Sequence, residues 1–338
     1  MLVTIGITTY DRVDLLEDTI NSVLNQTFSD FRIIVANDNP KRVLSFDNLQ
    51  IPRDVRVEIV NHKTNLGEID NLNWLLNQAS TPYFTWLADD DLLHPRFLEL
   101  LSTELLNHPT CKAVYTNYVS GATPSHFFWE SPVSKHFESF DTQEFLTRYS
   151  SRSLTLIGCY GLFELEQLRK MGGFKRLGSG YSPGADTLIP ILLSGMTQID
   201  YLDHELVFFR SHPESMSIYS DNLDSFISAE IDFIKYATEA IDKCPPDSRR
   251  VIYSQFRMWF QDNHFTVAQR QGGTRVLSLL VLFTKSEFQN FALFQKFDIG
   301  LLLDIQFFAS AIRRLAKRVL GDYVFPKMRR KVVAFLKR

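Results

Sequence analysis

Three consecutive aspartates, Asp89, Asp90 and Asp91, form the strongest chemical feature of the sequence. They come directly after residues 83–87, an apolar run with the composition of a buried strand. Adjacent carboxylates repel one another unless a cation lies among them, and Mg²⁺ and Mn²⁺ often join such oxygen ligands to a substrate diphosphate. The triplet alone leaves a second interpretation open, a solvated acidic turn before the helix that follows Pro95.

Polar side chains also follow two other predicted strands. Thr8, Tyr10 and Asp11 come after the apolar run 2–7, and Asp38 follows the run 31–36. Strand and helix patterns alternate over about the first hundred residues, which predicts a mostly parallel sheet with helices on both faces. In open sheets of this kind, ligands bind at the carboxyl ends of the strands. We therefore expect these side chains to share one site.

The chain resembles the family-2 glycosyltransferases, which have the GT-A (nucleotide-diphospho-sugar transferase) fold. The matching stretches are ITTYDRVDLLEDTINSVLNQTFSDFRIIVANDNP, NLGEIDNLNWLLNQASTPYFTWLADDDLLHP, GADTLIPILLSG and FFRSHPESMS. Together they cover about residues 1–218. Several motifs match in order and spacing, which makes the resemblance far more specific than any one of them.

The resemblance implies a set of nucleotide-binding residues. These are Thr8, Tyr10, Asp11, Asp38, Asn73 and Asp89. Asp38 matches an acid that accepts a hydrogen bond from a pyrimidine ring, and a carboxylate suits this role because uracil offers one N–H donor between two carbonyls. Many relatives have a second Asp just before it, and Asn37 departs from that pattern.

The resemblance also implies a divalent cation, Mn²⁺ or Mg²⁺. Asp90 matches the metal-binding acid of the DxD-type motif, and Asp91 and His212 are the other predicted ligands. Ala88 stands where many relatives have another acid, so the assignment can shift by one among the three aspartates.

His212 belongs to an Arg-x-His-x-x-Ser segment of the family, matched here by Arg210, His212 and Ser215. Arg210 or His212 would face the diphosphate, and a solvated histidine is the alternative interpretation of His212. Other histidines show no pattern and are expected to be surface or helix residues. They include His62, His94, His126 and His264.

Asp186 matches the catalytic base of the family, although Ala185 replaces the usual preceding Glu. By itself Asp186 is better explained as the N-cap of a short apolar helix, because such caps are common, and only the resemblance favours the base. It implies inversion by direct displacement: the base takes a proton from an acceptor hydroxyl while that oxygen attacks the anomeric carbon. The metal would stabilise the leaving nucleoside diphosphate.

The predicted fold class is α/β, a GT-A-type mostly parallel sheet flanked by helices, with a C-terminal helical extension. We expect a nucleotide-sugar-binding catalytic domain over residues 1–218 and a helical region over residues 219–338. The 45% hydrophobic and 22% charged residues exclude a disordered or fibrous chain. Three cysteines, with no CxxC, favour a reducing compartment and no zinc site.

Residues 311–338 form a basic tail. They hold ten Lys or Arg and one acid, Asp322, a net charge of +9, so the other 310 residues carry −12 within the total of −3. Basic and apolar residues mixed in this way predict a segment for an anionic membrane surface. A helix face packed on the body and a dimer contact are the alternatives, and a homo-oligomer is left open. No nucleic-acid partner is expected, because no recognised module accompanies the charge.

The N-terminus lacks the pattern of a signal peptide, and no run of 18 apolar residues indicates a spanning helix. We therefore expect a cytoplasmic protein, peripheral at the inner face of the membrane.

The leading hypothesis for the function is an inverting, metal-dependent glycosyltransferase. Its donor would be a nucleotide-diphospho-sugar, with a UDP-sugar favoured. Its acceptor would be a saccharide or a lipid-linked molecule in polysaccharide or glycolipid synthesis. The alternatives are a non-catalytic sugar-nucleotide-binding or membrane-assembly protein, and a sugar nucleotidyltransferase. The second is disfavoured because residues 8–12 contain no glycine.

Overall fold

The structure, a computed structural model, describes residues 1–130, 136–178, 182–212, 223–256 and 259. All of them lie in one compact unit, residues 1–271. The basic tail, Ser215 and His264 are outside the described residues.

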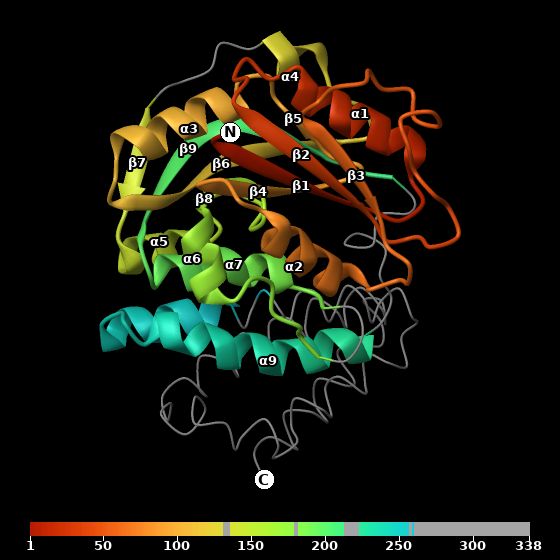
Figure 1. The fold of residues 1–338 in the computed structure, drawn as a ribbon. Coiled ribbons are helices and arrows are strands. Elements are labelled where there is room, and N and C mark those ends of the chain that lie inside the picture. Colours follow the sequence, from red (N-terminus) through yellow and green to blue (C-terminus); the bar gives the residue numbers. More distant parts are fainter. Residues whose placement is uncertain (131–135, 179–181, 213–222, 257–258, 260–338) are drawn as a thin grey trace, which may run out of the picture. The chain divides into compact units, whose positions relative to one another are not determined.

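A nine-stranded sheet forms the centre of the described part (Figure 1). The strands follow the order β3-β2-β1-β4-β8-β6-β9-β5, and β7 pairs with β9. Their bounds are β1 (Val3–Thr9), β2 (Phe31–Asn37), β3 (Val57–Asn61), β4 (Tyr83–Ala88), β5 (Leu92–Leu93), β6 (Cys111–Gly121), β7 (Phe137–Phe140), β8 (Gly161–Glu164) and β9 (Gln198–Arg210).

One half of the sheet is parallel and the other half is mixed. The strands β3, β2, β1 and β4 all run in the same direction. Beyond them β8 is antiparallel to both β4 and β6, β6 and β9 are parallel, and β5 and β7 are antiparallel to β9. The predicted α/β class is confirmed, and the parallel half is the part in which strand and helix patterns alternate clearly in the sequence.

Helices cover both faces of the sheet (Figure 1). Their bounds are α1 (Val13–Leu24), α2 (Glu68–Gln78), α3 (Phe97–Asn107), α4 (His126–Glu130), α5 (Thr142–Ser150), α6 (Leu165–Met171), α7 (Ala185–Ser194) and α9 (Leu223–Ile241). The apolar sides of α1 and α3 pack into one core, and those of α2, α5, α6, α7 and α9 pack into another.

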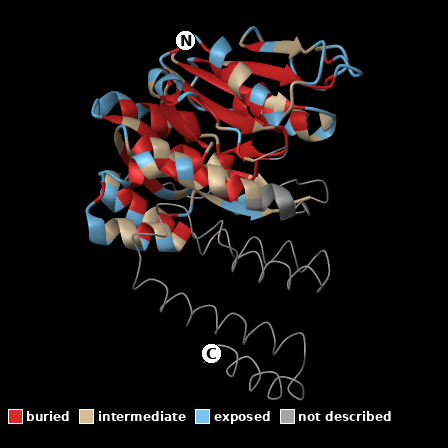
Figure 2. Ribbon diagram, turned by 90° about the horizontal axis from the view of Figure 1, so that it is seen from below, coloured by how far each residue is buried: buried red, intermediate tan, exposed pale blue. Residues whose placement is uncertain are grey.

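The central strands contribute to both cores, so they are buried on both faces (Figure 2). In β2, Ile33 and Val35 face the core of α1 and α3, while Ile34 and Ala36 face the opposite core. Side chains alternate across a strand, so a strand covered on both faces is apolar throughout. This explains why the apolar run 31–36 predicts a buried strand.

The described C-terminal residues are helical, as predicted. The helix α9 packs on α7, and residues 246–256 form a further helix. The described part contains no helix that is both long and apolar enough to span a membrane. The boundary near residues 219–222 stays a prediction.

His94 is not the surface or helix residue that we expected from the sequence. It follows the short strand β5 and is 2% exposed. Its Nδ1 accepts a hydrogen bond from the Arg96 N–H over 3.2 Å, and its ring packs edge-on against Phe128. Burial, with smaller effects of His204 and Arg96, lowers its pKa to about 4. The sequence prediction for His94 was wrong because nothing in the local pattern marks the turn after residue 91 as buried.

Candidate functional site

A pocket of about 180 Å³ opens at the carboxyl ends of β1 and β4. Thr8 lines it from the end of β1, Asp90 and Asp91 from the turn after β4, and Asp186 from the first turn of α7. The structure therefore brings four of the predicted site residues into one pocket. They meet there because parallel strands place their carboxyl ends at one edge of the sheet.

The acidic triplet is paired with a cation of the chain itself, Arg12. Its Nη2 lies 2.7 Å from Oδ1 of Asp89, which is fully buried, and its Nη1 contacts Oδ2 of Asp90. Burial opposes the charge on Arg12, but the two carboxylates outweigh it and the pKa of Arg12 is raised. Burial raises the pKa of Asp89 to about 6, with Arg12 acting in the opposite direction.

Asp91 differs from its two neighbours because its carboxylate is occupied within the fold. The backbone N–H of Arg210 donates to Oδ1 over 2.7 Å, and the hydroxyl of Tyr160 donates to Oδ2. Burial and the charge of Asp90 raise the pKa of Asp91. This carboxylate ties the turn after β4 to the end of β9, and its role as a metal ligand stays a prediction.

Asp186 lies in the first turn of α7 and is not the N-cap. The N-cap is Gly184, with a φ of 83°, and no side chain caps this helix. Burial raises the pKa of Asp186, whereas backbone N–H groups of the same turn lower it. A carboxylate with a raised pKa in a pocket is suited to accept a proton.

A second carboxylate, that of Glu68, lines the same pocket from the start of α2. Desolvation and repulsion from Asp186 raise its pKa to about 7, and the charge of Arg12 acts in the opposite direction. Part of the Glu68 side chain reaches solvent, so water screens the repulsion.

The predicted nucleotide residues at the end of β1 are accessible. Tyr10 is 50% exposed, which leaves its ring available for stacking on a base. Asp11 forms an exposed ion pair with Arg42 over 2.9 Å. Neither residue lines the pocket itself, and their nucleotide contacts stay predictions.

Asp38 and Asn73 both make structural contacts. Asp38 is buried and accepts hydrogen bonds from the backbone N–H groups of Leu66 and Gly67, over 2.7 and 2.8 Å. Asn73 exchanges two hydrogen bonds with the backbone of Phe174, and it is not among the pocket residues. Asp38 thus orders the loop before α2, and Asn73 joins α2 to the segment after α6. Their binding roles remain predictions.

His212 lies beside the acidic triplet, as predicted. Its Nε2 is 2.9 Å from Oδ2 of Asp90 and 3.4 Å from Nη1 of Arg12. Arg210 points instead toward α1, where its Nη2 is 3.0 Å from Asp18. Carboxylate oxygens of Asp89 and Asp90 with a nitrogen of His212 are a donor set that fits Mn²⁺ or Mg²⁺, and they already surround a positive group.

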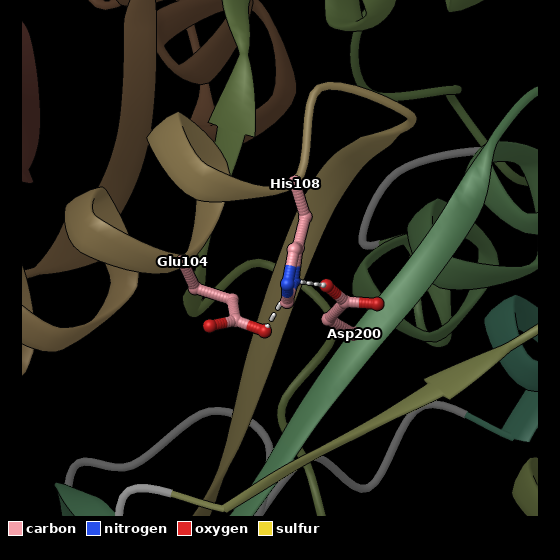
Figure 3. A group of neighbouring side chains, drawn as sticks. All are labelled: Glu104, His108 and Asp200. Carbon is pink, nitrogen blue, oxygen red and sulfur yellow. Dashed lines mark hydrogen bonds and ion pairs between the residues drawn. The ribbon is translucent and has the colours of Figure 1, made fainter.

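Figure 3 shows a different group of ligand-type side chains, at the end of α3 and on β9. Within the described residues, Glu104, His108 and Asp200 are the group whose ligand atoms gather within 4.8 Å of one another. Nδ1 of His108 is 2.8 Å from Glu104 and 3.4 Å from Asp200. Asp200 lies ten residues before Arg210 on β9, about 33 Å along the strand, so this group is not part of the pocket.

Four residues of the site were not identified in the sequence: Arg12, Glu68, Tyr160 and Gly158. Arg12 lies in the quoted motif, and its position two residues after Tyr10 was the available signal. Glu68 follows Gly67 at a predicted helix start, which offers only a weak signal. Tyr160 lines the pocket, and Gly158 lies against the backbone of Asp186. Both come from the irregular segment before β8, where the sequence shows no periodic pattern.

Comparison with known proteins agrees with this arrangement. Residues 4–167 match the sequence profile described as "Glycosyl transferase family 2". An uncharacterized glycosyltransferase of Haemophilus influenzae is 31% identical over 121 residues, 35% of this chain and 38% of that protein. The GalNAc(5)-diNAcBac-PP-undecaprenol beta-1,3-glucosyltransferase of Campylobacter jejuni is 40% identical over 89 residues, 25% of this chain and 28% of that protein.

Among solved structures, S. aureus TarS 1-349 in complex with UDP-GlcNAc is similar, with a TM-score of 0.56 and 14% sequence identity. The similarity covers 86% of this chain and 78% of the TarS chain. At this identity it shows the fold alone. The matches span well under half the length of these two curated relatives, the H. influenzae and C. jejuni proteins.

Proposed function

Residues 4–167 of this chain belong to glycosyltransferase family 2, and from that premise we propose that the protein transfers a sugar from a nucleotide-diphospho-sugar to an acceptor hydroxyl with inversion. One observation carries the proposal. Asp186, a carboxylate with a raised pKa, lines the same pocket as Asp90, and both lie at the carboxyl edge of the sheet.

In the proposed reaction the carboxylate of Asp186 accepts the proton of the acceptor hydroxyl. The acceptor oxygen attacks the anomeric carbon, and the bond from that carbon to the diphosphate oxygen breaks, so the diphosphate leaves with the electron pair. Displacement from the opposite side inverts the anomeric carbon without a covalent enzyme intermediate. Asp186 holds the proton afterwards and releases it to water.

Asp89, Asp90 and His212 would hold a divalent cation, Mn²⁺ or Mg²⁺, at the diphosphate end of the pocket. When bound, the cation supplies charge stabilisation for the leaving diphosphate. Tyr160 and Arg210 keep the triplet in place by fixing Asp91, which prevents the ligand-bearing turn from relaxing.

We favour a UDP-sugar as the donor. Two features support this choice: the exposed ring of Tyr10 and the buried acid Asp38 lie at neighbouring strand ends, and TarS, which is similar in fold, has been solved with UDP-GlcNAc. We favour a saccharide or lipid-linked acceptor in surface polysaccharide or glycolipid synthesis. The C. jejuni relative is named as a glucosyltransferase of a PP-undecaprenol saccharide, and that name supports the choice.

Calorimetric titration with UDP, GDP, dTDP and CDP, each with and without Mn²⁺, tests the nucleotide assignment. We expect metal-dependent binding of UDP and weaker binding of the others. If a folded protein bound none of the four nucleotides, a non-catalytic role would be favoured.

The rate of sugar transfer by the Asp186→Asn variant tests the assignment of the base. We expect a loss of about 10²–10⁴-fold in kcat, with UDP binding retained. Unchanged turnover would show that Asp186 is not the base.

We also propose that the protein is peripheral at the inner face of the membrane through its basic tail, residues 311–338. The proposal is supported by the net charge of +9 mixed with apolar residues. Co-sedimentation with vesicles of phosphatidylglycerol and phosphatidylcholine tests it, with the full chain compared to a deletion of residues 311–338. Binding by the full chain that salt weakens and the deletion abolishes is expected. Equal binding by both would overturn the assignment.

A further inference from the structure

We infer that Arg12 occupies the cation position of the acidic triplet and that a divalent metal binds there only when Arg12 leaves the carboxylates for the donor diphosphate. The inference deepens the proposed function and rests on it. It assigns to Arg12 a binding role in the donor site that the sequence motifs did not indicate.

The first support is the position of the guanidinium among the metal-type ligands. Nη1 of Arg12 contacts Oδ2 of Asp90, the same oxygen that lies 2.9 Å from Nε2 of His212. Two neighbouring ligands of an octahedral ion with bonds of about 2.1 Å lie about 3 Å apart. Asp90 and His212 therefore have the separation of two ligands on one ion, and Nη1 lies beside both of them.

The second support is that Arg12 provides the charge that the buried carboxylates need. Asp89 is fully buried and Asp90 nearly so, and Arg12 bridges the two with separate nitrogens. Buried carboxylates side by side are costly unless a cation compensates them. A divalent ion would supply the same compensation, so the ion and the guanidinium are alternatives for the same oxygens.

The two cations also repel each other at this range, because a metal on Oδ2 of Asp90 would be in direct contact with Nη1 of Arg12. The triplet does not gather as tightly as Glu104, His108 and Asp200 do among the described residues. Closure of Asp89 and Asp90 around a small ion therefore requires the guanidinium to move out from between them.

The donor diphosphate offers Arg12 a new partner. Arg12 lines the pocket, its side chain is 28% exposed, and it follows the polar turn at the end of β1. A planar guanidinium matches two phosphate oxygens at once, which makes arginine well suited to a diphosphate. Metal and nucleotide are then thermodynamically coupled, and each tightens the binding of the other.

The test measures Mn²⁺ binding by the full chain without nucleotide, from the electron paramagnetic resonance signal of free Mn²⁺. Arg12→Gln is expected to bind Mn²⁺ on the order of tenfold more tightly than the wild type. Adding UDP should tighten Mn²⁺ binding by a similar factor in the wild type and by much less in Arg12→Gln. Arg42→Gln removes the same charge from the same edge of the sheet, next to Asp11, and should bind Mn²⁺ as the wild type does.

Equal Mn²⁺ affinity of the wild type and Arg12→Gln without UDP would overturn the inference, as would a wild-type Mn²⁺ affinity that stays the same when UDP is shown to bind. Should Arg12→Gln fail to fold, Arg12→Lys keeps the charge with fewer directed donors and should bind Mn²⁺ with intermediate affinity. Failure of UDP to bind any variant with Mn²⁺ present would contradict the proposed function instead, and the comparison with Mn²⁺ alone would still decide the role of Arg12.

Discussion

A side chain at Gly158 would collide with the backbone of Asp186. A Cβ built on Gly158 would lie 1.8 Å from the carbonyl oxygen of Asp186 and 2.6 Å from its carbonyl carbon. Gly158 is held in turn by Tyr115, a fully buried residue whose hydroxyl donates to the Gly158 carbonyl over 3.2 Å. The start of α7, and with it the proposed base, therefore rests on a position that only glycine can occupy.

Gly158→Ala should reduce kcat by about 10²-fold while nucleotide binding is retained. The added methyl group must push the first turn of α7 outward, and a displacement of about 1 Å at a catalytic group is enough for a loss of this size. Gly121→Ala is the matched control, because its Cβ would meet its nearest neighbours at 3.7 Å. Steady-state kinetics and UDP calorimetry on both variants check the prediction. A Gly158→Ala enzyme with wild-type kcat would show that α7 is not held from this side.

Glu68→Gln should leave the acid limb of the pH profile of kcat/KM in place. The base must be ionised to accept a proton, and burial raises the pKa of Asp186 above the ordinary value of about 3.9, so activity should fall as the pH drops through that raised pKa. Repulsion from Asp186 helps to raise the pKa of Glu68 to about 7, so Glu68 is already protonated and uncharged at the acid pH values where Asp186 takes up its proton. Removing the Glu68 carboxyl therefore removes no charge from the pocket in that range. An acid limb that moved to lower pH would show that Glu68 keeps its charge beside Asp186.

A loss of activity in Glu68→Gln would also be informative. If Glu68 were itself the base, the substitution would remove activity at every pH. Glu166→Gln is a suitable control, since Glu166 lies on the exposed side of α6.

The strands of the parallel half of the sheet could be predicted from the sequence because they are covered on both faces and are therefore apolar. Residues 83–87 are apolar for that reason, and the structure has β4 at Tyr83–Ala88. Polar residues that break such a run stand where a strand leaves the core, which is why the triplet and Thr8 were located correctly.

Most strands of the second half of the sheet could not be predicted from the sequence. The strand β6 (Cys111–Gly121) ends in exposed residues, and β8 has four residues, too few for a period to appear. The first part of β9 was missed as well, because Asp200 and Asp203 interrupt its apolar pattern. Contacts between distant segments, such as Tyr160 with Asp91, depend on these unpredicted strands and could not be inferred.

Tyr160→Phe should lower the free energy of unfolding by about 1–3 kcal/mol. The hydroxyl donates to Oδ2 of buried Asp91 and accepts from the Ala88 N–H over 3.3 Å, so its removal leaves a buried carboxylate with one donor fewer. Tyr83→Phe removes a hydroxyl from the half-buried first residue of β4 and should change stability by about 0.5 kcal/mol or less. Urea unfolding of the two variants tests this, and equal losses would mean that the Asp91 contact contributes little.

The stability of the fold should decrease from neutral to acidic pH in part because of His94. The pKa of this buried imidazole is about 4 in the folded protein and about 6.5 in the unfolded chain, so the unfolded chain binds the proton more tightly. The contribution is therefore complete above pH 6.5 and is lost as the pH falls toward 4. A difference of this size corresponds to about 3 kcal/mol.

His94→Asn should remove this part of the pH dependence, since the asparagine oxygen can still accept from the Arg96 N–H but does not titrate in that range. The readout is the difference in unfolding free energy between wild type and variant, measured from pH 4 to pH 8. Carboxylates with raised pKa values, such as Asp89, have the opposite slope, but they are present in both proteins and cancel in the difference. His126→Asn, at an exposed histidine of α4, is the matched control. A constant difference between wild type and His94→Asn across this range would show that the folded protein accommodates a charged His94 as well as water does.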